Sequence, residues 1–367
     1  MRIPFLDLKA PHAEIREELD AAYHRVVDSG WFLLGSELEA FEAEFAAYCG
    51  AEHCVAVGSG CDALELGLRG LGIGVGDEVI VPSATYIATW LSVSAAGATP
   101  VPVEVDPATH LLDPARVEAA ITPATRAVMP VHLYGQAADL DALRRTAVAH
   151  GLAVVDDAAQ AHGARYRGRR VGTGTTATAF SFYPGKNLGA LGDGGAVLTS
   201  DAELADRLRL LRNYGSRRKY HHEIQATNSR LDELQAAILR VKLRHLDRWN
   251  RRRAQIAVQY QEGLGGLPGL RLPKTPTGTE PAWHLFVVGC DDRERLRKSL
   301  AEAGIGTLVH YPVPVHLSQA YADDTRWPAG THPIAESIAA QVLSLPMGPH
   351  LDDRDVSDVI AAVRAAL

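Results

Sequence analysis

The feature that most limits the fold of this chain is a series of short apolar runs that alternates with helical segments between about residues 53 and 200. The runs are His53–Val57, Glu78–Val81, Pro100–Val103, Ala127–Val131, Ala153–Val155, Ala177–Phe182 and Ala196–Leu198. Strands that are apolar nearly throughout and are separated by helices indicate a mostly parallel sheet that helices cover on both faces. The sequence therefore predicts a large α/β domain.

The pattern changes after this region, where apolar residues recur at the spacing of one long helix. They are Leu231, Leu234, Ile238 and Val241. The helix continues through the basic stretch Arg244–Arg253, and we expect it to link two domains. A Gly/Pro-rich segment, Gly263–Pro281, leads to an expected strand at His284–Val288 and an expected helix around Arg293–Ala303.

A last helix is indicated by apolar residues with helical spacing, namely Val356, Val359, Ile360, Val363 and Leu367. A chain of 367 residues, 47% of them hydrophobic, can bury a large core and is long enough for two domains. We predict a large domain over residues 1–245, which includes the N-terminal segment, and a smaller C-terminal α+β domain over residues 246–367.

The charge balance bears on the partners of the chain. A net charge of −7 argues against general affinity for nucleic acid. Two basic stretches, Arg217–Lys219 and Arg244–Arg253, lack the interleaved aromatic residues that stack bases, and a solvated helix flank explains them better. We therefore expect no nucleic-acid partner.

The cysteines and the N-terminus indicate the compartment. Cys49, Cys54, Cys61 and Cys290 show neither paired metal-ligand spacing nor the density of a disulfide scaffold, so we predict free thiols and no metal. The chain has no signal-peptide pattern and no apolar run of about 18 residues that could span a bilayer. A cytoplasmic protein without a membrane partner is expected.

Lys186 lies on a loop punctuated by Pro184 and Gly185, directly after an apolar strand. Strand ends are where α/β enzymes place their chemistry. A lysine held there, with Ser181 before it and Asp157 about thirty residues earlier, is the arrangement expected for a Schiff base to pyridoxal 5′-phosphate. A lone loop lysine is more often only solvated, but a solvated charge does not require so constrained a loop.

Two further segments make matching demands on one ligand. The turn Gly58–Ala63 joins a strand end to a helix start, whose free N–H groups suit a phosphate. An ordinary turn with Ser59 or Asp62 as a cap remains the alternative. Asp156 and Asp157 end a buried strand, where an acid can keep the pyridine nitrogen of the cofactor protonated. A magnesium site or a helix cap could equally use paired aspartates.

A fourth segment, Pro82–Trp90, follows the second strand and carries Tyr86. Tyr86 could cover the face of a planar ring, although core packing is the usual role of an aromatic residue at such a place. The prediction that Tyr86 covers a ring depends on the other three segments, which indicate the same ligand.

With these segments the sequence resembles the DegT/DnrJ/EryC1/StrS family of sugar aminotransferases, which have the fold-type I architecture of pyridoxal-phosphate enzymes. The resemblance covers nearly the whole chain, and its motifs together are highly specific. They are Ile3–Leu8, Asp157–Gly163, Ser181–Gly189, Thr227–Asp232 and Leu345–His350. The expected fold is a mostly parallel sheet sandwiched by helices, plus a smaller C-terminal α+β domain.

The resemblance implies a role for each cofactor residue. Lys186 would anchor the cofactor covalently, and Asp157 would pair with the pyridinium nitrogen. Gln160 would approach the ring hydroxyl and Tyr86 would cover the ring. The phosphate would be bound by Gly60, Cys61 and Ser181. Asn228 would reach the phosphate of the neighbouring subunit, which implies a homodimer with shared active sites.

Within the family, the chain is most similar to aminotransferases that act on dTDP-3-keto-6-deoxyhexoses in the making of aminosugars such as desosamine and mycaminose. The loop Tyr183–Gly189 is typical of these, whereas many 4-aminotransferases carry a histidine before the corresponding proline. This implies amination at C3. L-Glutamate would leave its amino group as pyridoxamine 5′-phosphate and depart as 2-oxoglutarate, and the dTDP-linked keto sugar would then take up the amine.

Substrate contacts are predicted from residue type and position. On the sugar side we expect His162, Tyr183, His310, Tyr311 and His316. At the nucleotide diphosphate we expect Tyr214, Arg218, Lys219, Tyr220 and Arg230, because arginine and lysine suit phosphate oxygens.

Other functions remain open at this point. The nearest is a 4-keto sugar nucleotide aminotransferase or a keto-cyclitol aminotransferase of the same family, and a non-catalytic regulatory protein could keep the same fold. Lys186 argues against the related dehydratase branch, in which a histidine replaces the lysine. A dinucleotide-dependent oxidoreductase is disfavoured because the G-x-G-x-x-G pattern is absent from the glycine-rich helix start.

Overall fold

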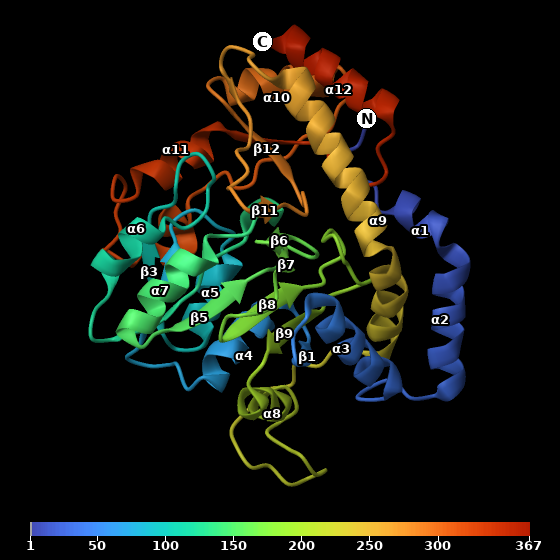
Figure 1. Cartoon of the computed structure of the whole chain (residues 1–367), viewed down its shortest axis with the longest axis vertical. Helices are drawn as coiled ribbons and strands as arrows, with labels where there is room; N and C mark the ends of the chain where they lie inside the picture. The colour runs from blue at the N-terminus through green and yellow to red at the C-terminus, as the bar shows by residue number, and fades with distance from the viewer. Residues whose placement is uncertain (1) are drawn as a thin grey trace.

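The computed structural model describes residues 2–367 and is built around a seven-stranded sheet with the order β1-β9-β8-β5-β4-β2-β3. Its strands are β1 (His53–Val57), β2 (Glu78–Pro82), β3 (Thr99–Val103), β4 (Thr125–Val128), β5 (Ala153–Asp157), β8 (Ala177–Ser181) and β9 (Gly195–Thr199). Strands β3, β2, β4, β5 and β8 run parallel, while β9 is antiparallel to both its neighbours. All seven predicted strands are therefore confirmed as one mostly parallel sheet (Figure 1).

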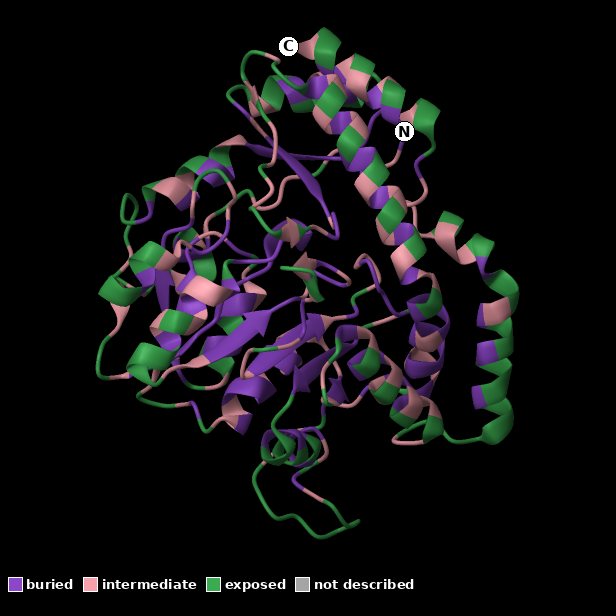
Figure 2. Ribbon diagram, in the orientation of Figure 1, coloured by how far each residue is buried: buried purple, intermediate pink, exposed green. Residues whose placement is uncertain are grey.

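Helices cover both faces of this sheet, because alternate strand residues are apolar on each face. One face packs against α4 (Gly60–Gly70), α5 (Ala88–Ala95) and α8 (Ala202–Leu211). The other packs against α3 (Ser36–Cys49), α7 (Leu140–His150), the short α6 (Pro114–Val117) and the first half of α9 (Glu233–Leu264). Figure 2 shows the strands buried between these layers.

The helix starts follow from local sequence. Asp139, Asp201, Asp292 and Asp352 cap α7, α8, α10 (Arg293–Glu302) and α12 (Asp353–Ala366), each accepting a backbone N–H bond from the first turn. Ser59 does the same for α4. Each of these caps directly precedes the helix whose apolar residues recur with helical spacing in the sequence.

The predicted long helix is α9, which has 32 residues and reaches from the large sheet to a second, three-stranded sheet (Figure 1). That sheet has the order β10-β12-β13. Its strands are β10 (Leu270–Arg271), β12 (Phe286–Cys290) and β13 (Val342–Leu345). Helices α10 and α11 (Pro333–Gln341) lie beside it, and α12 packs on α9 and α10. The expected strand at 284–288 begins two residues later than predicted, whereas the two predicted C-terminal helices are confirmed.

The N-terminal segment packs with the C-terminal part of the chain. Ile3 pairs with Ile305 and lies in the same buried cluster as Tyr260 and Phe286. Next come α1 (Lys9–Glu14) and α2 (Arg16–Ser29), and α2 packs along α9. The predicted boundary between residues 245 and 246 falls within α9, and the division into two domains stays a prediction.

A small hairpin adds a third sheet, formed by β6 (Arg165–Tyr166), β7 (Arg169–Arg170) and β11 (Thr279–Glu280). The cysteines are free, as predicted. Within residues 2–367, no cluster of three or more His, Cys, Asp or Glu side chains could hold a metal ion. Among the same residues, no helix is both long and apolar enough to cross a membrane.

Candidate active site

Lys186 lies on a tightly closed loop that follows β8. The loop is closed by two backbone bonds, from Ala190 N to Phe182 O (2.7 Å) and from Lys186 N to Tyr183 O (2.8 Å). A Cβ atom at Gly189 would lie 2.4 Å from the carbonyl oxygen of Pro184, so only glycine fits there. The loop therefore presents Lys186 from a rigid backbone, as predicted from its Pro and Gly residues.

Burial of the Lys186 amine lowers its pKa to about 8, and the nearby Asp157 carboxylate acts in the opposite direction. A substantial fraction of the amine is therefore neutral near physiological pH. A neutral amine is the form that can attack a carbonyl carbon.

Asp157 ends β5 with a buried carboxyl group. Its Oδ2 accepts a bond from Thr89 Oγ1 (2.8 Å) and its Oδ1 accepts one from the N–H of Ala159 (3.1 Å). Burial raises the pKa of Asp157, while these bonds and the positive charge of Lys186 oppose the rise. A cationic partner in the site would therefore stabilise the ionised form of the Asp157 carboxyl group.

Asp156 lies on the other face of the sheet. It accepts a bond from Thr175 Oγ1 (2.9 Å), and its Oδ2 lies 3.6 Å from Nε2 of the buried His132. Because neighbouring strand residues point to opposite faces, the two aspartates cannot share a metal ion. The magnesium interpretation of this pair is therefore wrong, and a lone acid at Asp157 remains.

The glycine turn before α4 lies against the lysine loop. A Cβ atom at Gly60 would lie 2.5 Å from Cβ of Ser181, and one at Gly195 would lie 2.2 Å from the carbonyl oxygen of Ser59. Ser59 caps α4 by accepting the N–H of Asp62, so the N–H groups of Gly60 and Cys61 are left without a recorded partner within residues 2–367. Ser59 therefore caps α4, as the alternative reading of this turn predicts, and two N–H groups of the same turn still remain for a phosphate.

Cys61 lies in the first turn of α4, and Asn228 lies in the segment before α9 that is bonded to this turn through Ser229. The Cys61 thiol faces α5, with Sγ 3.2 Å from Ser92 Oγ, so only its backbone N–H is available to a phosphate. Asn228 is exposed, and the adjacent Ser229 accepts the N–H of Gly58 (2.9 Å) and donates to Asp62 Oδ2 (2.7 Å). The reach of Asn228 into a second subunit stays a prediction.

Gln160 is bonded within the chain at both ends of its amide. Its Oε1 accepts the N–H of Tyr134 (2.7 Å), and its Nε2 donates to the hydroxyl of Tyr311 (3.0 Å). Tyr134 in turn donates to the carbonyl oxygen of His310 (2.6 Å). One Nε2 hydrogen of Gln160 remains for a ring hydroxyl.

Tyr86 is 51% exposed, and its ring centroid lies 5.1 Å from that of Tyr311. Tyr183, directly before the constrained turn, is 57% exposed. Tyr86 and Tyr183 are thus open to solvent, Tyr183 three residues before Lys186 and Tyr86 beside Tyr311. His310 is partly exposed, and its Nδ1 lies 2.8 Å from Ser344 Oγ.

Two predicted sugar contacts are contradicted by burial. His162 is fully buried, with its ring 5.1 Å and 5.9 Å from those of Phe180 and Phe182, and burial lowers its pKa to about 3. His316 is 4% exposed and lies 3.1 Å from Glu336 Oε1. Neither ring can line an open sugar site, so both predictions are corrected.

The predicted nucleotide contacts lie on an excursion between α8 and α9 that extends beyond α8 (Figure 1). Tyr214 and Tyr220 are exposed there, as are Arg218 and Lys219. Arg230 donates to Asn213 Oδ1 (3.1 Å) at the base of the excursion. Within the excursion, the guanidinium group of Arg230 lies 5.4 Å from the ring centroid of Tyr214, and the amine of Lys219 lies 5.2 Å from that of Tyr220.

A larger cavity of about 540 Å³ lies beside the site, with Tyr134 in its wall. Pro107–His110, Arg271–Lys274 and residues of α11 line it, so it lies between the large sheet and the C-terminal part of the chain. Tyr134 connects this cavity to the candidate site, because its N–H donates to Gln160 Oε1.

The comparisons with known proteins agree with this geometry. A model of the DegT/DnrJ/EryC1/StrS aminotransferase family matches residues 13–364. The chain belongs to this family. As a family member it is an enzyme of the aminotransferase class, and the family depends on pyridoxal phosphate.

Particular relatives of this aminotransferase are close to it in sequence and structure. It is 65% identical over 363 residues to dTDP-3-amino-3,4,6-trideoxy-alpha-D-glucose transaminase of Streptomyces venezuelae, covering 99% of this chain and 96% of that one. It is 63% identical to the erythromycin biosynthesis sensory transduction protein EryC1 of Saccharopolyspora erythraea over 365 residues, 100% of each chain. The crystal structure of S. venezuelae DesV with a ketimine intermediate has a TM-score of 0.98 at 65% identity and covers 99% of this chain and 98% of that one.

The aminotransferase site fits its cofactor. Ser181 packs directly against Gly60 at the start of α4, where the N–H groups of Gly60 and Cys61 have no hydrogen-bond partner among residues 2–367. A buried acid, Asp157, and a lysine of lowered pKa, Lys186, lie at the ends of neighbouring strands. These are the groups that a phosphate, a pyridine nitrogen and an aldehyde require.

Sequence reasoning missed two residues of the aminotransferase site. Thr89 holds Asp157, and its only signal was its place one turn after Tyr86. The Nδ1 of His284 lies 3.1 Å from Asn187 Oδ1, next to Lys186, and burial lowers its pKa well below the usual value, an effect that Lys186 strengthens. His284 lies in a segment predicted only as a strand.

Proposed function

We propose that this enzyme transfers an amino group from L-glutamate to the C3 keto group of a dTDP-3-keto-6-deoxyhexose and produces a dTDP-3-amino sugar. The observation that carries the proposal is the convergence of Lys186, Asp157 and the glycine-lined start of α4 at one edge of the sheet. The dTDP-sugar specificity is supported by the transaminase from S. venezuelae, which shares 65% of its residues with this chain.

In this proposal the cofactor is held by residues from several elements. Gly60, Cys61 and Ser181 bind its phosphate, Asp157 pairs with its ring nitrogen, and Lys186 anchors it covalently. Tyr86 covers the ring, and Gln160 donates its free Nε2 hydrogen to the ring hydroxyl. When bound, pyridoxal phosphate supplies an electron sink for the bonds at the reacting carbon.

The Lys186 amine would have a second task once it is released from the cofactor. Its Nζ would take a proton from the Cα of the bound glutamate and return it at the neighbouring carbon, and the same atom would act in reverse during amination of the sugar. A pKa of about 8 suits this, because the amine can both accept and release a proton near neutral pH. Because 2-oxoglutarate would depart before the keto sugar takes up the amine, the two half-reactions would follow each other in a ping-pong cycle.

The proposal includes a homodimer in the cytoplasm, with each site completed by Asn228 and the Tyr214–Tyr220 excursion of a second subunit. Support comes from an apolar shelf, Trp31–Leu33, whose Trp31 and Phe32 are 62% and 50% exposed. Exposed apolar patches of this kind mark interaction surfaces.

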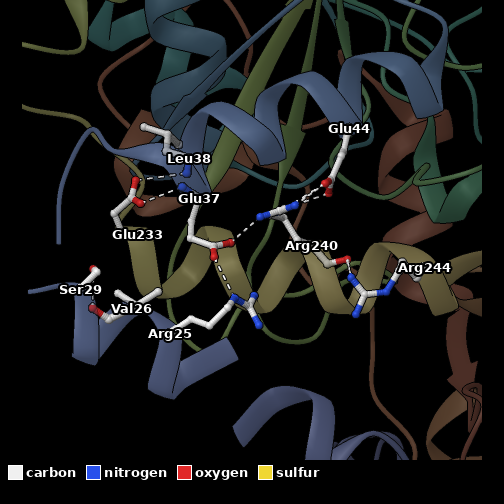
Figure 3. A network of polar contacts seen from close by, with 9 residues as sticks. All are labelled: Arg25, Val26, Ser29, Glu37, Leu38, Glu44, Glu233, Arg240 and Arg244. Carbon is white, nitrogen blue, oxygen red and sulfur yellow. Dashed lines mark hydrogen bonds and ion pairs between the residues drawn. The ribbon is translucent and has the colours of Figure 1, made fainter. Parts of the chain in front are cut away.

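A polar network holds this shelf in place. Glu233 accepts the N–H groups of Gly35 (2.8 Å), Glu37 (2.9 Å) and Leu38 (3.1 Å) at the start of α3. Figure 3 shows the network, in which Arg240 bridges Glu37 and Glu44. The N–H of Glu233 also donates to the carbonyl oxygen of Phe32 (3.1 Å), which joins the network directly to the shelf. A shelf held in this way is preorganised for a partner surface.

The experiment that tests the function is a product analysis. The purified enzyme would be given L-glutamate with dTDP-linked 3-keto or 4-keto 6-deoxysugars, or with a keto-cyclitol, and NMR would locate the new amine. Amine at C3 of the dTDP sugar supports the proposal. Amine only at C4 or on the cyclitol contradicts it and favours those alternatives. The absence of any amine transfer would favour a regulatory protein, an alternative that the name of the S. erythraea relative keeps in view.

A further inference from the structure

The loop segment that follows Lys186, residues 187–191, runs along one face of α9. Gln235 Oε1 accepts the N–H of Leu191 (2.7 Å), Lys242 Nζ donates to the carbonyl oxygen of Gly189, and Asn250 Oδ1 accepts a bond from Asn187 Nδ2 (2.9 Å). The three α9 residues are seven and eight positions apart, about two helical turns each, so they share a face. The loop after Lys186 is therefore attached to α9 at every second residue.

Lys242 is the unusual member of this row. It is only 4% exposed, and among residues 2–367 it forms no ion pair with a carboxylate. Burying an ammonium group without an acidic partner is costly, and an apolar side chain of the same length would avoid that cost. The lysine provides a charged donor that an apolar side chain lacks, and its recorded acceptor is Gly189.

The bond from Lys242 to Gly189 affects Lys186 because Gly189 belongs to the same closed loop. Its carbonyl lies where the loop folds back on Pro184, and the next residue, Ala190, closes the loop on Phe182. Lys242 and the stretch Pro184–Lys186 also line the same small cavity of about 30 Å³ behind the loop. A movement at Gly189 is therefore passed to Lys186 through a short, closed loop.

We propose that Lys242 is a positioning residue for Lys186: its ammonium group, carried by α9, fixes the carbonyl of Gly189 and thereby the place of the Lys186 amine relative to Asp157. The inference rests on the proposed function, since it assigns Lys242 a part in holding Lys186 at the cofactor. It also ties the lysine loop to a helix that reaches the second sheet.

The test compares Lys242→Met with Arg244→Met. Methionine keeps the length of the chain but has no donor, and Arg244 is an exposed cation of the same helix whose partner is Glu18 of α2 (2.8 Å). In Lys242→Met we expect the dissociation constant for pyridoxal phosphate to rise about tenfold or more, as expected when a bond from a charged donor is lost. The pH midpoint of the visible absorbance of the bound cofactor should shift as well. Lys242→Arg, which keeps a donor, should restore part of the affinity and part of the pH midpoint, and Arg244→Met should change neither quantity.

Two controls separate positioning from folding. The thermal midpoint of cofactor-free Lys242→Met should equal or exceed that of the wild type, because a buried charge is removed. Cofactor-free protein is also labelled with an amine-reactive reagent, and mass spectrometry follows the rate at Lys186, which should change in Lys242→Met alone. Wild-type values for affinity, pH midpoint and labelling rate in a well-folded Lys242→Met would overturn the inference, as would a collapse of its fold. A wild-type chain that takes up no pyridoxal phosphate contradicts the proposed function instead, and the labelling rate then decides the positioning role by itself.

Discussion

Asp157 and Asp156 stand side by side in the chain but have different surroundings. Asp157 faces the site with Thr89 and the N–H of Ala159 as its partners, whereas Asp156 faces the opposite layer with Thr175. The difference arises from the alternation of side chains along β5. We therefore expect only Asp157 to take part in catalysis, and a substitution of Asp156 serves as the control for a substitution of Asp157.

We expect Asp157→Asn to lower kcat by about 100-fold to 10,000-fold, because an amide cannot keep the ring nitrogen of the cofactor protonated. Asp156→Asn should change kcat by less than about threefold and act on stability instead. Steady-state kinetics with saturating pyridoxal phosphate, together with thermal unfolding, measure both effects. Equal loss of kcat in the two variants would count against the role given to Asp157.

The identity of single side chains is also where sequence reasoning reached its limit. Lys186, Asp157 and Gly60 were found because each follows a recognisable strand or begins a helix. His162 was misassigned because the sequence does not reveal that its ring packs between Phe180 and Phe182. Burial depends on residues that are distant in the chain, and a motif does not report it.

The start of α4 shows how one element builds a binding site from backbone alone. Within residues 2–367, the N–H groups of Gly60 and Cys61 in its first turn have no hydrogen-bond partner, and they lie at the positive end of the helix. The absence of a side chain at Gly60 lets Ser181 approach. Gly67, in the same helix, has ordinary space, since a Cβ there would lie 3.8 Å from Val155.

We predict opposite outcomes for alanine at these two glycines. Gly60→Ala should weaken pyridoxal-phosphate binding and lower the free energy of unfolding by about 1–3 kcal/mol, because its Cβ would overlap Ser181. Gly67→Ala should raise stability by about 0.5–1 kcal/mol, as for glycine replaced within a helix. Denaturant unfolding and cofactor titration test the pair, and a Gly60→Ala variant with wild-type affinity would contradict the predicted phosphate site.

Helix α9 carries a further, pH-dependent prediction. Burial lowers the pKa of Lys242 from 10.5 to about 8, so the unfolded chain binds more protons than the folded chain between these values. The free energy of unfolding should therefore rise with pH from about 8 to 10.5, and the penalty is fully present below pH 8. Lys242→Met should flatten this rise by about 1–3 kcal/mol. An unchanged slope in urea unfolding would contradict the buried charge.

At the level of the molecule, apolar runs revealed the large sheet because its strands are covered on both faces. The strands β6, β7 and β11 have two residues each, too few for any periodicity to appear. The chain also returns its first residues to the C-terminal part, where Ile3 pairs with Ile305. Such pairing of distant segments leaves no local pattern.

The proposed shared site can be tested by mixing inactive chains. Lys186→Ala and Asn228→Ala variants should each have little activity, but a mixed dimer should regain it, because one site then combines Lys186 of one chain with Asn228 of the other. Refolding the two together and measuring activity tests this. Failure to regain activity in a verified mixed dimer would place Asn228 in the site of its own chain.

The shelf itself provides a separate test of assembly. Trp31→Ser with Phe32→Ser should convert a dimer to a monomer in analytical ultracentrifugation, since a central aromatic pair contributes most to an interface. The exposed Val148, at 82%, lies on α7, away from the shelf, and Val148→Ser should leave the assembly unchanged. Dimers that persist in the double variant would exclude the shelf as the interface.

The central claim is that Lys186 carries the cofactor, and borohydride reduction tests it most directly. Protein loaded with pyridoxal phosphate, reduced and digested would be analysed by mass spectrometry, with Lys186→Ala treated in parallel. The account predicts a phosphopyridoxyl group on Lys186 that is absent from the variant and is lost from the wild type when L-glutamate is added before reduction. A label on another lysine, or no label at all, would contradict it.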